Sequence, residues 1–222
     1  HEQLCWLALS WGAELGPAAF GRALKAHGTA AAVLEADPET LTLGDARLKP
    51  EQAKAITYLR SDLDSFREEL RDLALHQVHV YFSPDPGYPR PFRELPHPPP
   101  VVCVAGELMP IDDLAVAVVG TRTPSGEGAD MAANVAHALA SCDFTVVSGL
   151  ARGIDTCAHQ GALERDGRTL AVLGSGVLNV HPPENVQLGA RIRQMGAIIS
   201  ELAPRAQPSV PSLMARNRLI SV

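Results

Sequence analysis

Residues 144–165 read FTVVSGLARGIDTCAHQGALER and contain a strand-to-helix junction. The apolar run at 144–148 predicts a strand that is buried on both of its faces. A glycine-rich turn follows this run, and residues 155–165 have the apolar spacing of a helix. A short buried strand, a tight turn and a helix in this order are typical of a parallel α/β sheet.

The same alternation continues through residues 111–222. Further strands are predicted at 115–119, 170–173 and 197–200, and further helices at 125–140 and 185–194. The connections are short, and strands that are joined through helices in this way form βαβ units. We therefore predict an α/β fold with a mostly parallel sheet and helices on both faces of that sheet.

Residues 1–75 differ from the rest of the chain because their sequence predicts helices and no strands. We expect a small bundle of four or five helices. An apolar stripe runs from Leu4 to Trp11, and a long helix that begins at Pro50 carries a second stripe as far as Leu73. The turn at 14–17 faintly resembles a helix-hairpin-helix DNA module. However, the 8 basic and 12 acidic residues of this part favour an ordinary helix start with proline at its first position.

A proline-rich segment joins the two parts of the chain. Nine of the 18 prolines lie from Pro84 to Pro110, so we expect an extended loop without a helix there. Short strands are predicted on either side of its centre, at 79–82 and 101–104. The apolar character of the segment indicates the entry into the second domain rather than a free linker.

Composition excludes several classes of protein. The chain has 222 residues, 46% of them hydrophobic, and a mean hydropathy of +0.03. No run approaches the roughly 18–20 apolar residues that cross a bilayer, and the N-terminus lacks the layout of a secretory signal. A membrane protein, a disordered chain and a secreted precursor are therefore disfavoured. Four cysteines without C-x-x-C spacing fit no metal site and indicate a reducing cytoplasm.

The net charge of −6 argues against a broad basic surface for duplex DNA. Yet the nine basic residues of 111–222 are all arginines. Arginine binds phosphate through two parallel hydrogen bonds and lies flat on bases. A few arginines in one cleft would make an anion site that the net charge hides. A coding bias towards arginine explains the same pattern equally well.

Glycine-rich turns follow three of the predicted strands, at 120–126, 148–155 and 174–176. In an open parallel sheet, ligands lie beyond the carboxyl ends of the strands, where helix N-termini direct free N–H groups. We expect these turns to form an anion cradle, with Arg122 and Arg152 as charged arms. The spacing fits neither a dinucleotide-binding fingerprint nor a P-loop, so no cofactor is expected. The alternative is that the glycines serve tight turns only.

No catalytic set is evident in the sequence. Asp155 begins a predicted helix, so we expect it to be the N-cap of that helix. We expect His159 to lie on the surface of the same helix or to pack against its neighbours. His181 precedes two prolines, so we expect it to be a loop residue that positions the turn. Glu201 ends a strand, where it would meet either a ribose hydroxyl or an arginine, and the sequence leaves both open. No serine has a histidine–aspartate relay.

Four motifs resemble those of the DprA/Smf family, the DNA-processing proteins of bacterial natural transformation. Residues 120–125 (GTRTPS) resemble G-S-R-x-x-S, and residues 148–159 (SGLARGIDTCAH) resemble S-G-x-A-x-G-I-D-x-x-A-H. Residues 173–185 (LGSGVLNVHPPEN) resemble G-x-G-x-D-x-x-Y-P-x-x-N, and residues 216–221 (RNRLIS) resemble R-N-R-I-I-S. The chain departs from the third motif by having Asn179 for aspartate, His181 for tyrosine and Pro183 where the family often has a basic residue.

This resemblance implies both the architecture and a function. It implies an extended Rossmann-like DNA-binding domain at 76–222, preceded by a helical, sterile-alpha-motif-like domain at 1–75. Family members continue beyond the equivalent of Val222, so we expect the second domain to be incomplete at its C-terminus. The implied function is non-catalytic binding of single-stranded DNA, which protects incoming DNA. The implied protein partners are the RecA recombinase, which the protein loads, the single-strand-binding protein and a second copy in a cytoplasmic homodimer.

The resemblance and the glycine-rich turns together predict a set of DNA-binding residues. Backbone N–H groups of the five glycines would receive phosphates, and the last two arginines would line the cleft or hold its wall. The set comprises Gly120, Thr121, Arg122, Ser125, Ser148, Gly149, Arg152, Gly153, Gly174, Ser175, Gly176, Asn185, Arg216, Asn217 and Arg218.

Two other functions remain open at this point. One is a Rossmann-like nucleoside-monophosphate hydrolase, although the string P-G-G-x-G-T-x-x-E of such enzymes is absent. The other is a protein-interaction module in which residues 1–75 carry the partner surface. The second half of the chain has one aromatic residue, Phe144, so DNA affinity would come mainly from phosphates and arginines, with little sequence preference.

Overall fold

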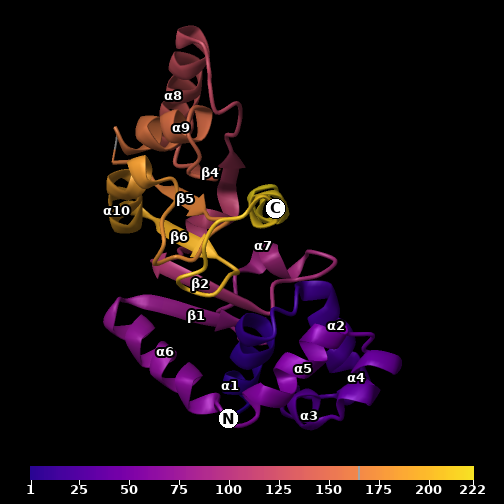
Figure 1. Ribbon diagram of the computed structural model, residues 1–222. Coiled ribbons are helices and arrows are strands. Elements are labelled where there is room, and N and C mark those ends of the chain that lie inside the picture. Colours follow the sequence, from indigo (N-terminus) through magenta and orange to yellow (C-terminus); the bar gives the residue numbers. More distant parts are fainter. Residues whose placement is uncertain (165) are drawn as a thin grey trace. The chain divides into compact units, whose positions relative to one another are not determined.

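The computed structural model describes residues 1–164 and 166–222 (Figure 1). The chain divides into two units, which are described separately. The first comprises His1–His76, Val80–Tyr88 and Phe92–Val102, and the second comprises Gln77–His79, Pro89–Pro91 and Cys103–Val222. Two segments beyond residue 75 therefore group with the helical unit, and a single domain limit at 75/76 stays a prediction.

The first unit is mainly helical, as the sequence predicts. Its helices and one π-helical segment are α1 (Glu2–Leu7), η1 (Ala8–Gly12), α2 (Pro17–His27), α3 (Ala30–Glu35), α4 (Pro38–Leu43), α5 (Pro50–Leu59) and α6 (Leu63–Leu75). Aromatic rings mark its core, because the Trp6 ring lies 4.8 Å from the Phe20 ring and 6.2 Å from the Phe82 ring. This core makes the unit self-contained in its packing.

Two expectations for this unit were wrong. The chain forms more helices than four or five, because Asp37 and Pro38 begin the short helix α4 as well as ending α3. The long helix from Pro50 is interrupted between α5 and α6. Arg60 leaves the helix and donates through Nε to the Leu34 carbonyl at 2.6 Å, and Asp62 then takes the N-cap position of α6.

A six-stranded sheet has the strand order β1-β2-β6-β5-β4-β3. The strands are β1 (Val78–Phe82), β2 (Val101–Gly106), β3 (Ala115–Ala117), β4 (Thr145–Ser148), β5 (Thr169–Val172) and β6 (Ala197–Ser200). The pairs β3–β4, β4–β5 and β5–β6 are parallel, and β2–β6 is antiparallel. The structure thus confirms the mostly parallel sheet, whose central strands β4, β5 and β6 are buried throughout.

The proline-rich segment is not free of helix, contrary to expectation. It contains α7 (Arg90–Arg93), and the 3-10 helix η2 (Pro110–Leu114) begins at its last proline. Both helices have proline in the first turn, where the missing N–H group of proline has no partner to lose. Proline therefore starts these helices rather than preventing them.

The remaining elements of the second unit are helices. They are α8 (Gly126–Ser141), α9 (Ile154–Leu163), the 3-10 helix η3 (Pro183–Asn185), α10 (Val186–Met195) and α11 (Val210–Ile220). Figure 1 shows α10 and α11 on opposite sides of β5 and β6, so helices lie on both faces of the sheet. The predicted end of the α9 segment, Arg165, lies outside the described residues.

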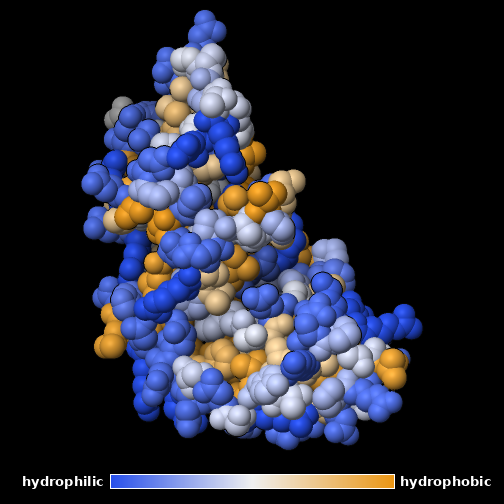
Figure 2. All heavy atoms as spheres, in the orientation of Figure 1, coloured by the Kyte–Doolittle hydropathy of each residue, from blue (hydrophilic) through white to orange (hydrophobic). Residues whose placement is uncertain are grey.

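Helix α11 was not predicted from the sequence. Ser209 caps it by accepting from the Ser212 N–H at 3.2 Å, and its inner side buries Leu219 and Ile220. Its outer side leaves Val210 and Met214 75% and 68% exposed, and Figure 2 shows hydrophobic surface there. Among the described residues, no helix is both long and apolar enough to span a bilayer.

Candidate functional site

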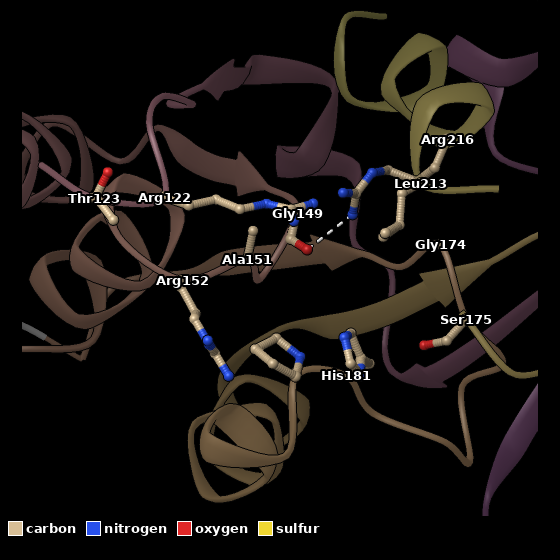
Figure 3. Close-up of a pocket in the computed structure, with 11 residues that line it drawn as sticks. Arg122, Thr123, Gly149, Ala151, Arg152, Gly174, Ser175, His181, Leu213 and Arg216 are labelled. Atoms are coloured by element: carbon tan, nitrogen blue, oxygen red, sulfur yellow. Dashed lines mark hydrogen bonds between the residues drawn. The ribbon is translucent and has the colours of Figure 1, made fainter. Parts of the chain in front are cut away.

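A pocket of about 300 Å³ opens beyond the carboxyl ends of β4 and β5 (Figure 3). We call it the arginine pocket because three arginines lie on its wall. Its lining residues are Arg122, Thr123, Gly149, Ala151, Arg152, Gly174, Ser175, His181, Pro182, Leu213 and Arg216. It therefore lies where an open parallel sheet is expected to bind a ligand.

A second cavity of about 630 Å³ adjoins the arginine pocket. Arg122, Ala151, Leu213 and Arg216 line both, so these residues form the wall between the two spaces. The second cavity adds three of the predicted residues, which are Gly120, Asn217 and Arg218.

Arg216 forms the floor of the arginine pocket. Its side chain is 5% exposed, and Nη1 donates to the Gly149 carbonyl at 2.8 Å and to the Val172 carbonyl. It thereby ties α11 to the ends of β4 and β5. A Cβ atom on Gly149 would lie 2.7 Å from the guanidinium carbon, so only glycine leaves room for this contact. Burial lowers the pKa of Arg216. The charge of nearby Asp155 raises this pKa, and the charge of nearby Arg122 lowers it further.

Asp155 lies beneath the same turn. Its Oδ2 accepts from the N–H groups of Gly149 at 3.1 Å and Ala151 at 3.3 Å. Burial raises the pKa of Asp155, and these backbone donors lower it. The predicted N-cap role was wrong, because Gly153 holds that position of α9 and Asp155 instead fixes the turn before the helix.

This arrangement changes how the glycine-rich turns can act. The Gly149 N–H already donates to Asp155, and the Gly176 N–H donates to the Ala206 carbonyl at 2.9 Å. These two donors are therefore already occupied within the protein, contrary to the prediction that they receive phosphates. Of the five predicted backbone donors, these two cannot add to an anion site unless the turns rearrange.

Arg122 and Arg152 form the exposed rim of the pocket. Figure 3 shows the Arg122 side chain extending towards Gly149 and Arg216, and among the described residues it makes no hydrogen bond or ion pair. Arg152 pairs with Glu184, and their side chains are 64% and 53% exposed. Asp155, which lies nearer in the sequence, is held instead by the backbone of the turn.

His181 also lines the pocket (Figure 3). We expected His181 only to position a loop, so its place on the wall is a correction. Leu213 adds apolar surface opposite the rim. The sequence carried a signal for His181, since it replaces the tyrosine of the family motif, but no signal for Leu213.

The structure divides the predicted residues into two groups. Those that line the arginine pocket or the second cavity are Gly120, Arg122, Gly149, Arg152, Gly174, Ser175, Arg216, Asn217 and Arg218. Those that support the surrounding turns without lining either space are Thr121, Ser125, Ser148, Gly153, Gly176 and Asn185.

The supporting group has clear local roles. Ser125 caps α8 by accepting from the Gly128 N–H at 3.1 Å. Gly153 adopts a φ of 80° and lies so close to the Thr121 carbonyl that a Cβ atom would be 2.3 Å from that oxygen. Asn185 is buried and donates to the Leu150 carbonyl at 2.9 Å. These residues shape the pocket from behind.

The titratable groups behind the pocket are bound to other protein groups. His159 is fully buried, as the packing interpretation predicts, and its Nδ1 lies 2.7 Å from Thr169 Oγ1. Burial, with a smaller effect of Arg216, lowers the pKa of His159 to about 3. Glu201 pairs with Arg218, which was one of its two predicted roles, and burial raises its pKa. Among the described residues, no cluster of side chains fits a metal ion.

Comparison with known proteins gives two family matches. Residues 79–222 match the family described as DNA recombination-mediator protein A, and residues 1–57 match the DprA-like N-terminal HHH domain. HHH abbreviates helix-hairpin-helix, so the second match favours the resemblance of the turn at 14–17 to such a module over an ordinary helix start.

Individual proteins agree with these matches. The chain is 34% identical to Protein Smf of Synechocystis over 99% of its own length and 56% of that protein. It resembles the crystal structure of DNA processing protein A from Streptococcus pneumoniae with a TM-score of 0.77 and 27% identity, over 96% of this chain and 72% of that chain. The chain spans about half the length of the sequence relatives that it matches.

A second solved structure concerns DNA processing protein A from Helicobacter pylori, whose title describes its single-stranded DNA binding mode. The TM-score is 0.58 and the identity is 29%, over 65% of this chain and 64% of that chain.

Proposed function

The chain belongs to the DprA/Smf family of DNA-processing proteins, and on that premise we propose that its arginine pocket binds the backbone of single-stranded DNA. One observation carries the proposal. Arg122 extends into the pocket beside Arg216 and has no acceptor among the described residues. An exposed guanidinium without a protein partner is free to bind a phosphate through two hydrogen bonds.

The charge of the pocket supports this proposal. Its lining includes Arg122, Arg152 and Arg216, and none of the lining residues is acidic. Asp155 and Glu184 contact the wall from outside the lining, and each is bound to a group of the protein. The pocket is therefore locally basic although the chain as a whole has a net charge of −6. Local positive charge of this kind attracts the DNA backbone.

The lining also indicates which part of the DNA dominates affinity. It contains no phenylalanine, tyrosine or tryptophan, so the wide stacking surfaces of many single-strand binders are missing from it. We propose that phosphate contacts supply most of the affinity and that sequence preference is weak.

We extend the proposal to the roles that the family resemblance implies. The protein would protect incoming single-stranded DNA, displace single-strand-binding protein and load the RecA recombinase during natural transformation, as a cytoplasmic homodimer. All four cysteines, which the structure describes, are free, as expected in a reducing compartment.

We also propose that binding involves no catalytic step. The Ser148 and Ser175 hydroxyls donate to the carbonyls of Val118 and Asn179, so neither is held by a histidine. Asp155, the carboxylate beneath the pocket, is held by backbone N–H groups. These contacts disfavour the nucleoside-monophosphate hydrolase, and we expect the purified chain to leave AMP intact under the conditions of DNA binding.

Titration of a labelled oligo-dT at several salt concentrations tests the proposal. Arg122→Ala should weaken binding by about 1–3 kcal/mol, the range for a hydrogen bond to a charged group. The log–log salt slope should fall by roughly 0.7, the value for one single-strand phosphate contact. The loss should be similar for dT, dA and mixed sequences.

Arg191→Ala is the matched control, because Arg191 is an exposed arginine on α10 that lines neither cavity. Both variants remove one positive charge, so a loss confined to Arg122→Ala assigns the effect to the pocket. Unchanged affinity and slope for Arg122→Ala would exclude the arginine pocket as the DNA site.

A further inference from the structure

Of the two arginines on the rim of the pocket, Arg152 forms an ion pair with Glu184. The two residues come from different segments, since Arg152 lies in the turn before α9 and Glu184 lies in η3, 32 residues further on. Both side chains are more than half exposed. An ion pair that faces solvent in this way is weak and open to exchange with another anion.

The position of Glu184 is fixed by its neighbours. The adjacent residue Asn185 is buried and donates to the Leu150 carbonyl at 2.9 Å and to Thr156 Oγ1 at 2.8 Å. These bonds hold η3 against the turn that carries Arg152. A backbone hydrogen bond and the charges of Arg152 and His181 lower the pKa of Glu184. Glu184 is therefore a permanent carboxylate beside a basic pocket.

We propose that Glu184 competes with the DNA phosphate for Arg152 and so limits the affinity of the pocket for single strands. A carboxylate and a phosphodiester present the same kind of acceptor to a guanidinium. Glu184 Oε1 accepts from Nη2 of Arg152, so a phosphate that binds the same edge of this guanidinium must displace Glu184 from it. Arg122 is then the permanent phosphate contact, and Arg152 is a second contact that forms when Glu184 is displaced. This proposal rests on the proposed function of the pocket.

Glu184→Gln tests the competition because it removes the charge and keeps the size of the side chain. Oligo-dT should bind about two- to fivefold more tightly, the range of coupling measured for exposed ion pairs. The salt slope should become steeper by roughly 0.7, corresponding to one additional phosphate contact. The change should not affect folding, since the Glu184 side chain is exposed.

Glu164→Gln is the matched control for net charge. Glu164 is exposed and lies at the C-terminal end of α9, while the pocket lies before the N-terminal end of that helix. Ten helical residues span about 15 Å, which exceeds the screening length of roughly 8 Å at physiological salt. Glu164→Gln should therefore leave affinity nearly unchanged.

The decisive measurement is the same substitution in an Arg152→Ala background. If Glu184 acts by occupying Arg152, the gain from Glu184→Gln should shrink there to the level of the Glu164→Gln control. An equal gain in both backgrounds would overturn the proposal and indicate simple repulsion of the DNA. No gain in either background would also overturn it. Failure of the proposed function gives a different result. In that case the parent chain does not bind oligo-dT, or Arg122→Ala binds it with unchanged affinity and salt slope.

Discussion

The floor and the rim of the arginine pocket use the same residue type in opposite ways. On the floor, Arg216 is 5% exposed and donates to the carbonyls of Gly149 and Val172. On the rim, Arg122 is exposed and, among the described residues, has no acceptor. The difference follows from burial, since a buried guanidinium must be satisfied by the protein and an exposed one is available to a ligand. Motif residues of one type therefore divide into those that the protein itself satisfies and those that it leaves available to a ligand.

The largest effect should come from the floor. Arg216→Ala removes a buried donor that joins α11 to two strands, and it leaves the Gly149 and Val172 carbonyls without that partner. Each buried group left unsatisfied is costly, so the free energy of unfolding should fall by about 3 kcal/mol. Urea unfolding followed by circular dichroism measures this loss.

Arg191→Ala serves as the control here as well, because Arg191 is exposed on α10. The control should change the free energy of unfolding by less than about 0.5 kcal/mol. If Arg216→Ala unfolds at the same urea concentration as the control, the division between floor and rim is wrong.

A second effect, which comes from His159 behind the pocket, depends on pH. The pKa of His159 is about 3 in the folded chain and near 6.5 when unfolded, so below pH 6.5 the unfolded state binds the proton first. The stability that the folded chain gains from keeping His159 neutral is therefore complete above pH 6.5 and is lost as the pH falls towards 3. Between pH 7.5 and pH 5 this residue alone should cost about 2 kcal/mol of unfolding free energy.

His159→Asn sharpens the measurement, because an asparagine side chain also offers an N–H group to Thr169 Oγ1 without titrating. The variant should lose about 2 kcal/mol less than the parent chain between the two pH values. His181→Asn is the matched variant, since it removes an exposed imidazole from the pocket wall. If the free energy of unfolding depends on pH equally in the parent chain and in His159→Asn, burial does not lower the pKa of His159 and this prediction is wrong.

Much of the fold could be predicted because it depends on local patterns. The apolar runs located β4, β5 and β6 to within one or two residues, since strands buried on both faces tolerate few polar side chains. The rest depended on contacts that no local pattern encodes. Helix α11 has a weak apolar stripe and is held by Arg216, and the break before α6 depends on Arg60 reaching α3.

The site divides in the same manner. The glycine-rich turns and Arg122 were predicted because strand ends of a parallel sheet meet at one edge. The sequence could not show which backbone N–H groups are free, because the Asp155 carboxylate turns back to accept from the N–H groups of Gly149 and Ala151. Nor could it show that Glu184 reaches Arg152 across 32 residues. Partners in space decide which motif residues remain available to a ligand.

The smallest effect on stability should come from the rim, and it completes the comparison. Arg122→Ala removes an arginine that donates to no described acceptor, so no buried group loses a partner. The charge of Arg122 also lowers the pKa of Arg216, which means that the two guanidinium groups repel each other. Removing Arg122 relieves this repulsion, and the free energy of unfolding should stay within about 0.5 kcal/mol of the parent value or rise slightly. The urea titration used for Arg216→Ala measures it. A loss as large as that of Arg216→Ala would place Arg122 among the structural residues and would remove the reason for assigning it a phosphate.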